Sequence, residues 1–126
     1  MFEWNQKYSV GIHSIDAQHR NLFAVARELY DAMSAGLGKS TLSRILDRLV
    51  QYTQVHFAHE ERLMKQNAYP NLVEHQEQHA ALTRQLLMFQ ADFKSGRATM
   101  TVQLLNFLRS WLEQHIRIRI KPTRPT

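Results

Sequence analysis

The stretch Val55-His56-Phe57-Ala58-His59-Glu60-Glu61 places a histidine and a glutamate on the apolar face of a long helical pattern. His56 and Glu60 are four residues apart, so on an α-helix both side chains leave from one face, one turn apart. The other positions of this face are mostly apolar, and they are Leu42, Ile45, Leu46, Leu49, Tyr52, Thr53 and Leu63. Burying a lone carboxylate is costly unless it is paired or bound to a metal. The pattern therefore predicts that Glu60 has a partner inside the protein.

Four stretches of the chain show apolar residues at the helical period, and turn-forming residues separate them. They predict helices over about residues 16–36, 40–66, 70–94 and 98–117. Ser14 or Asp16 is the expected N-cap of the first helix, and Pro70 suits the first position of the third. Short connections between long amphipathic helices favour antiparallel neighbours. The predicted fold is therefore an all-α, antiparallel up-down-up-down four-helix bundle.

The two ends of the chain differ in character from these helices. Residues 1–15 hold scattered apolar side chains and Gly11, and they predict an extended N-terminal arm that packs across the helix ends. Residues 118–126 are basic and interrupted by proline, and they predict a non-helical tail. We expect residues 1–126 to form one domain.

The net charge of +5 raises the question of nucleic-acid binding. Four of these charges lie near the C-terminus, on Arg117, Arg119, Lys121 and Arg124. Because the rest of the chain is nearly neutral and carries no recognition motif, the sequence predicts no nucleic-acid partner.

The composition bears on the compartment. Cysteine is absent, so neither disulfides nor thiolate metal ligands are available. The N-terminal residues lack the apolar core of a signal peptide, and no apolar run approaches the roughly 20 residues of a membrane span. These features predict a soluble, cytoplasmic protein without membrane contact, and the polar outer faces of the helices suit a monomer.

Five histidines join Glu60 on the apolar faces of the predicted helices. They lie near the start of the first and third helices and near the end of the second and fourth, at positions His19, His56, His75, His79 and His115. In an antiparallel bundle all of them therefore meet at one end. A single histidine on such a face is usually a hydrogen-bonded core residue, but five with a glutamate predict a metal site. His13 and His59 lie off these faces and are expected on the surface or in the arm.

The number of these side chains limits the kind of metal site. Six nitrogen and oxygen ligands exceed the four that a tetrahedral zinc ion takes. They suit two ions that share a carboxylate, and Glu60 has the two oxygens for such a bridge. The donor types alone leave iron, zinc, copper and nickel open. The segment His75-Gln76-Glu77-Gln78-His79 is not a zinc-protease motif, because its glutamate is one position away from the required place.

At these residues the chain resembles the hemerythrin family, and in particular its single-domain bacterial members, the bacteriohemerythrins. The resemblance covers nearly the whole chain. It is carried by Trp4, Tyr8-Ser9-Val10-Gly11-Ile12, Ile15-Asp16, Gln18-His19, His56-Phe57, Glu60-Glu61, Tyr69-Pro70, His75, His79, Trp111-Leu112 and His115-Ile116.

The resemblance implies a non-haem di-iron centre, with an oxo or hydroxo bridge, that binds O2 or small anions. By this resemblance His75, His79 and His115 hold one iron, His19 and His56 hold the other, and Glu60 bridges them. The residues that match the family's apolar oxygen pocket are Leu22, Phe57, Trp111, Leu112 and Ile116. The implied role is that of an oxygen carrier, store or sensor and not an enzyme. The alternatives are an oxidase-like, peroxidase-like or nitric-oxide-reactive di-iron protein, and a metal-depleted structural remnant.

The chain departs from the family pattern at one position of the implied site. The family has a second bridging aspartate five residues after the last histidine, where this chain has Ile120. No acidic residue follows Glu113. We therefore expect an incomplete carboxylate bridge and a weaker iron position at His19 and His56. Asp16 is a candidate substitute by topology, with helix capping as its other expected role.

Overall fold

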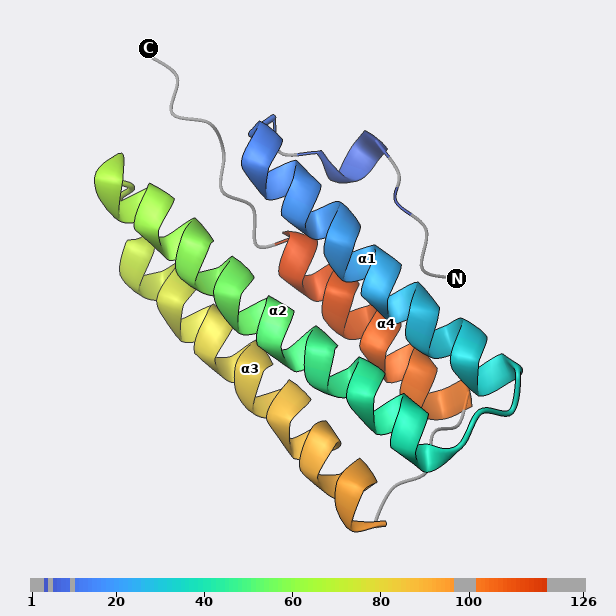
Figure 1. The fold of residues 1–126 in the computed structure, drawn as a ribbon. Helices are drawn as coiled ribbons and strands as arrows, with labels where there is room; N and C mark the ends of the chain where they lie inside the picture. Colours follow the sequence, from blue (N-terminus) through green and yellow to red (C-terminus); the bar gives the residue numbers. More distant parts are fainter. Residues whose placement is uncertain (1–3, 5, 10, 97–101, 118–126) are drawn as a thin grey trace.

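The computed structural model describes residues 4, 6–9, 11–96 and 102–117, with the side chains of residues 7, 102–104, 116 and 117 left out. Its elements are a short 3-10 helix, η1, and the helices α1 to α4 (Figure 1). Their bounds are Gln6–Tyr8 for η1, His13–Ser34 for α1, Lys39–Gln66 for α2, Leu72–Ser95 for α3 and Val102–Arg117 for α4. Within the described residues there is no strand. No helix among them is long and apolar enough to cross a membrane.

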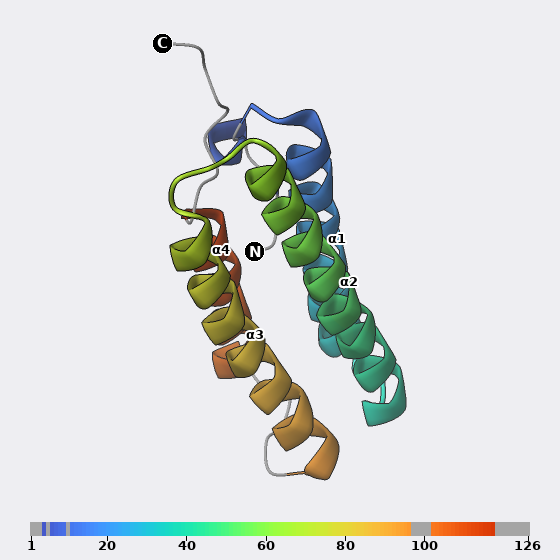
Figure 2. The same ribbon diagram turned by 90° about the vertical axis from the view of Figure 1, so that its left-hand side faces the viewer.

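The four long helices run alternately up and down. Contacts join α1 to α2, α2 to α3, α3 to α4 and α4 back to α1. Figure 1 shows that each of these pairs is antiparallel. Figure 2 shows the α1–α2 pair on one side and α3 with α4 on the other. The predicted all-α four-helix bundle is confirmed.

The start of the first helix differs from the prediction. α1 begins at His13, with Ile12 in extended conformation at the N-cap and no side-chain capping bond. Capping by Ser14 or Asp16 is therefore wrong, because both residues lie inside the first turn. The Ser9 hydroxyl instead donates a hydrogen bond of 2.5 Å to the Asp16 carboxylate. The Asp16 carboxylate therefore accepts a hydrogen bond from Ser9 of the arm and does not cap the helix.

The arm is shorter and less extended than residues 1–15, because η1 interrupts it and α1 begins before its expected end. Figure 1 shows η1 beside α1, and the aromatic residues of the arm pack on that side of α1. The Tyr8 ring stacks on Phe23 with centroids 5.3 Å apart, and the Trp4 ring meets Phe23 edge-on at 6.1 Å. The arm therefore packs along α1 and not only across the helix ends.

The other helix ends largely follow the sequence. Pro70 lies in the turn before α3 and not at its first helical position, which Leu72 occupies. α3 ends at Ser95 and is capped by Gly96, whose φ of 82° is the left-handed conformation that favours glycine at a helix C-terminus. The expected start of α4 near residue 98, the tail of residues 118–126 and Ile120 lie outside the described residues.

Apolar side chains fill the bundle in two clusters. The large one takes residues from all four helices, among them Leu29, Leu46, Leu86 and Leu108. The small one joins Ile15 of α1 to Met64 of α2, with Tyr69 and others packed against it. On α1 and α2, buried polar side chains lie between the two clusters.

Candidate metal centre

The six predicted ligand side chains all lie inside the bundle. None is more than 7% exposed, and His56 and His115 are fully buried. α1 contributes one, α2 and α3 two each and α4 one: His19 from α1, His56 and Glu60 from α2, His75 and His79 from α3, and His115 from α4. The predicted convergence at one end of the bundle agrees with this placement.

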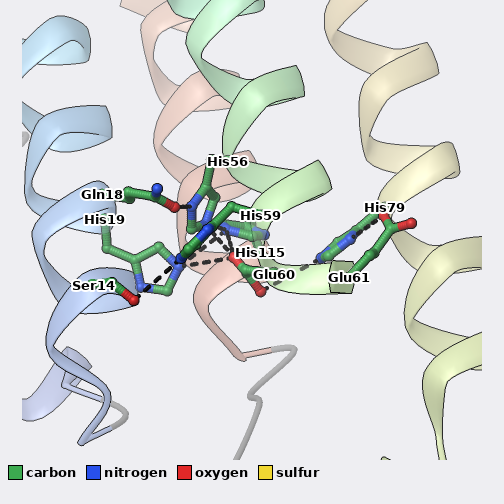
Figure 3. Close-up of polar contacts among 9 residues, drawn as sticks. All are labelled: Ser14, Gln18, His19, His56, His59, Glu60, Glu61, His79 and His115. Atoms are coloured by element: carbon green, nitrogen blue, oxygen red, sulfur yellow. Dashed lines mark hydrogen bonds and ion pairs between the residues drawn. The ribbon is translucent and has the colours of Figure 1, made fainter. Parts of the chain in front are cut away.

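Four of these residues form a compact group: His19, His56, Glu60 and His115, whose ligand atoms all lie within 4.8 Å of one another (Figure 3). Nε2 of His115 is 3.2 Å from Nε2 of His19 and 2.9 Å from Nε2 of His56. Oε1 of Glu60 lies 3.3 Å from Nε2 of both His19 and His115, and it also contacts Nε2 of His56. Three imidazole nitrogens therefore surround one carboxylate oxygen.

The remaining two histidines lie toward the other oxygen of the same carboxylate. Nε2 of His79 is 3.8 Å from Oε2 of Glu60. The ring of His75 lies next to that of His79, with centroids 6.4 Å apart, and meets Tyr69 edge-on at 5.6 Å. Glu60 thus separates a group of three histidines from a pair.

Hydrogen bonds outside the group determine which ring nitrogens carry hydrogen. Nδ1 of His56 is 2.6 Å from Oε1 of Gln18, and Nδ1 of His79 is 2.9 Å from Oε2 of Glu61. Both oxygens accept, so both Nδ1 atoms donate, and in a neutral ring Nε2 then carries a lone pair. These lone pairs face the oxygens of Glu60, which are also acceptors.

This arrangement of acceptors supplies a test of whether the residues fit a metal. Lone pairs that face a carboxylate repel it unless a proton or a cation lies between them. Within the described residues, Nε2 of His79 is also buried without a hydrogen-bond partner, and it lies on the side of Oε2 of Glu60. A metal ion bound between the imidazoles and the carboxylate would remove the repulsion. The residues present therefore fit a metal centre.

The protonation states of the group also suit metal binding. Burial by itself raises the pKa of Glu60, but interactions with the imidazoles, first His115 and then His19 and His56, hold the pKa well below its usual range. Burial lowers the pKa of His115 to about 3, and it also lowers the pKa values of His56 and His75. The result is an anionic Glu60 beside neutral rings of His56, His75 and His115, the forms in which these side chains bind metals.

The helical period gives no role to Gln18 and Glu61, although both belong to the motifs that carry the family resemblance. Each lies directly beside a predicted ligand in the sequence, next to His19 and Glu60 respectively. Neither lies on the apolar face, and this is why periodicity alone missed them. Their position directly beside a predicted ligand was the only sequence feature in these motifs that could have identified them as partners of the site.

The predicted oxygen-pocket residues surround the group only in part. Leu22, Phe57, Trp111 and Leu112 are all buried, whereas the side chain of Ile116 lies outside the described part. The Phe57 ring stacks on His79 with centroids 4.0 Å apart and lies 4.7 Å from the ring of His115. Nε1 of Trp111 donates a 2.8 Å hydrogen bond to the carbonyl oxygen of Leu82, which holds its ring near His115.

The remaining candidates lie apart from the compact group. His13 is exposed. Nε2 of His59 lies 3.1 Å from the hydroxyl of Ser14, and Figure 3 includes both of these residues. Asp16 is buried but is not among the four grouped ligands. His13 is therefore on the surface, whereas His59 is only partly exposed.

Comparisons with known proteins agree with the site. The family model of the hemerythrin HHE cation binding domain matches residues 10–118. A bacteriohemerythrin of Stenotrophomonas maltophilia is 30% identical over 114 residues, which are 90% of this chain and 73% of that protein. One of Methylococcus capsulatus is 28% identical over 110 residues, covering 87% of this chain and 83% of the relative. A myohemerythrin of Theromyzon tessulatum is 25% identical over 116 residues, covering 92% and 85%.

The family match spans most of the chain, and the described residues include a buried histidine and glutamate cluster that can hold metal. The chain therefore belongs to the hemerythrin family, whose members are non-haem di-iron proteins that bind O2.

Proposed function

We propose that this chain binds O2 at a di-iron centre and acts as an oxygen carrier, store or sensor and not as an enzyme. The observation that carries the proposal is the position of Glu60. One of its oxygens faces three imidazole nitrogens, and the other faces His79. A carboxylate placed in this way can bridge two cations.

We assign His75, His79 and His115 to one iron and His19 and His56 to the other, with Glu60 as the bridge. The contacts support this division except at His115, whose Nε2 lies nearer to His19 and His56. The His115 ring is nevertheless close to both sides, with its centroid 5.0 Å from those of His19 and His56 and 5.6 Å from that of His79. The match of His115-Ile116 to the family motif supports the assignment of His115 to the iron of His75 and His79.

When bound, two ferrous ions would supply the two electrons that O2 takes up. The chain's own residues supply ligands, negative charge and a dry environment. The buried rings of Phe57 and Trp111 exclude water from the side of the group that faces the large apolar cluster. Glu60 offsets one positive charge, and Ile120 offers none where the family has a second carboxylate. We therefore propose that the His19 and His56 position holds its iron more weakly.

A second candidate function is a structural site for a single ion. The specific observation in its favour is that three histidines and one glutamate lie within 4.8 Å of one another, a set that suits one tetrahedral zinc ion. With a single ion at this position, His75 and His79 would have no metal to bind. The two candidates therefore differ in the number of ions per chain.

The experiment is anaerobic loading with ferrous iron, a metal count per chain, and repeated cycles of oxygen and argon with visible absorption as the readout. Two irons and an absorption change that reverses in every cycle are the expected result. Repeated consumption of O2 without reversal would indicate oxidase-like turnover. One ion per chain, and no response to oxygen, would favour the structural site.

The finer parts of the proposal are a monomeric state and a cytoplasmic location. Size-exclusion chromatography of the iron-loaded protein should give the mass of one chain, and cell fractionation should recover it with cytoplasmic markers.

A further inference from the structure

Two residues outside the predicted ligand set contact the buried imidazoles from opposite sides of the group. Oε1 of Gln18, on α1, is 2.6 Å from Nδ1 of His56. Oε2 of Glu61, on α2, is 2.9 Å from Nδ1 of His79 on α3. Figure 3 shows Gln18 beside His56 at one side of the labelled residues and Glu61 beside His79 at the other.

Both contacts have the same effect on the tautomer of the ring. The acceptor holds hydrogen on Nδ1 and leaves the lone pair of Nε2 pointing toward Glu60. Such a bond also restricts rotation of the ring, so Nε2 stays aimed at the place where an ion would lie between imidazole and carboxylate.

The two contacts differ in charge. Gln18 offers a neutral amide oxygen, whereas Glu61 offers a carboxylate. A histidine that donates to a carboxylate becomes a more basic metal ligand than one that donates to a neutral acceptor. Glu61 therefore places a negative charge next to His79, and the neutral Gln18 places none next to His56.

We propose that Gln18 and Glu61 are positioning residues that make the two halves of the metal centre unequal, with Glu61 strengthening the His79 half. This inference rests on the di-iron function proposed above. It also identifies a carboxylate that supplies negative charge at one half of a centre in which Ile120 replaces the family's second bridging aspartate. A purely structural role, in which Glu61 only ties α2 to α3, is the competing explanation.

The first test measures affinity for ferrous iron under argon against a competing chelator. Glu61→Ala should weaken one of the two iron equivalents about 10- to 100-fold. Glu61→Gln keeps an acceptor but removes the charge, so its loss should be smaller. Glu77→Gln is the matched control, because it removes the same charge from an exposed position on α3 between His75 and His79. Gln18→Glu should strengthen the other equivalent and leave the first unchanged.

The second test needs no metal. Nitrogen-15 NMR of the histidine rings should show His79 as the Nδ1–H tautomer in the parent and in Glu61→Gln, and as a mixture in Glu61→Ala. Thermal melting then separates positioning from structure. A positioning role reduces mainly the gain in melting temperature that iron produces, whereas a structural role reduces melting equally with and without iron.

The inference is overturned if Glu61→Ala and Glu77→Gln bind iron equally well, or if Glu61→Ala lowers melting by the same amount in both states. One iron per chain in the parent would refute the di-iron function separately. If Glu61→Ala weakens binding of that single ion, the role of Glu61 is still confirmed. If binding of the ion is unchanged, the role of Glu61 is overturned. A parent that binds no iron would overturn both.

Discussion

The two ends of this bundle are built from the same helices but bury different chemistry. At the end where α1 and α3 begin, the described buried side chains include five histidines and Glu60. Toward the opposite end the buried residues are apolar, among them Leu42, Phe89 and Phe93, and the ionic contact between Asp47 and Lys94 lies on the surface. Each helix contributes buried side chains to both ends, at positions that follow one helical period.

The comparison shows that the helical period determines which positions are buried. It does not determine which partners the buried polar groups find. At the apolar end, packing alone stabilises the buried groups. At the histidine end, packing leaves ring nitrogens of the described residues, Nε2 of His79 among them, without a hydrogen-bond partner, and it places lone pairs against a carboxylate. Buried polar residues in an otherwise apolar core are expected to have a functional role. The following variants test this difference between the ends.

The largest effect is expected from Glu60→Ala at the histidine end. It removes the carboxylate that faces both groups of imidazoles, so we expect most of the bound iron to be lost. Because metal binding contributes to folding free energy, the rise in melting temperature that iron produces should disappear with it. Metal analysis and thermal melting in the presence and absence of iron provide the measurement. Unchanged iron content in Glu60→Ala would contradict the assignment of this residue.

Leu86→Ala is the matched change at the apolar end. Leu86 is 1% exposed, and truncating such a leucine costs about 2–5 kcal/mol of unfolding free energy. We expect this loss in denaturant unfolding both with and without iron, and we expect the iron content of the folded protein to remain unchanged. A loss that appears only when iron is present would mean that the two ends are not independent.

Leu112→Ala tests the boundary between the ends. Leu112 is 1% exposed and precedes His115 on α4 by three residues, so its loss opens space next to the histidine group. We expect a several-fold faster oxidation of ferrous iron, because water and anions reach the site more easily. Stopped-flow absorption measures this rate, and Leu108→Ala, one turn further into the apolar cluster, is the control. Equal rates in both variants would leave Leu112 with a packing role alone.

The smallest effect is expected at the surface contact of the apolar end. Nζ of Lys94 lies 2.7 Å from Oδ1 of Asp47, and this hydrogen bond, together with one from Gln90, holds the pKa of Asp47 below its usual value although burial opposes it. A lowered folded-state pKa gives a stability contribution that is present at neutral pH and is lost as the pH falls through that pKa. Both side chains are nearly half exposed, so solvent screening keeps the contribution under about 1 kcal/mol.

Denaturant unfolding of the parent and of Asp47→Asn checks this expectation. The parent should be slightly more stable at pH 7, and the difference should shrink as the pH is lowered below the ordinary carboxyl range. Iron content should not change in the variant. A difference that grows toward low pH would contradict the sign of the shift.

Much of the fold and of the candidate site followed from the sequence alone. The helical period of apolar residues placed the four helices, and the short connections predicted their antiparallel order. These two facts together brought His19, His56, Glu60, His75, His79 and His115 to one end, where all six are buried. This inference needed only local information, because a helix presents residues at steps of three and four on one face whatever it packs against.

Contacts between elements were decided only by the tertiary structure. Asp16 has a suitable position and chemistry to cap α1, yet the arm supplies Ser9 as its hydrogen-bond donor. His115 comes from α4, and its Nε2 lies closest to residues on α1 and α2. Gln18 and Glu61 reach histidines on other helices and so set their tautomers. Such pairings depend on the rotation and spacing of neighbouring helices, which the packing of the whole core determines and no single helical pattern contains.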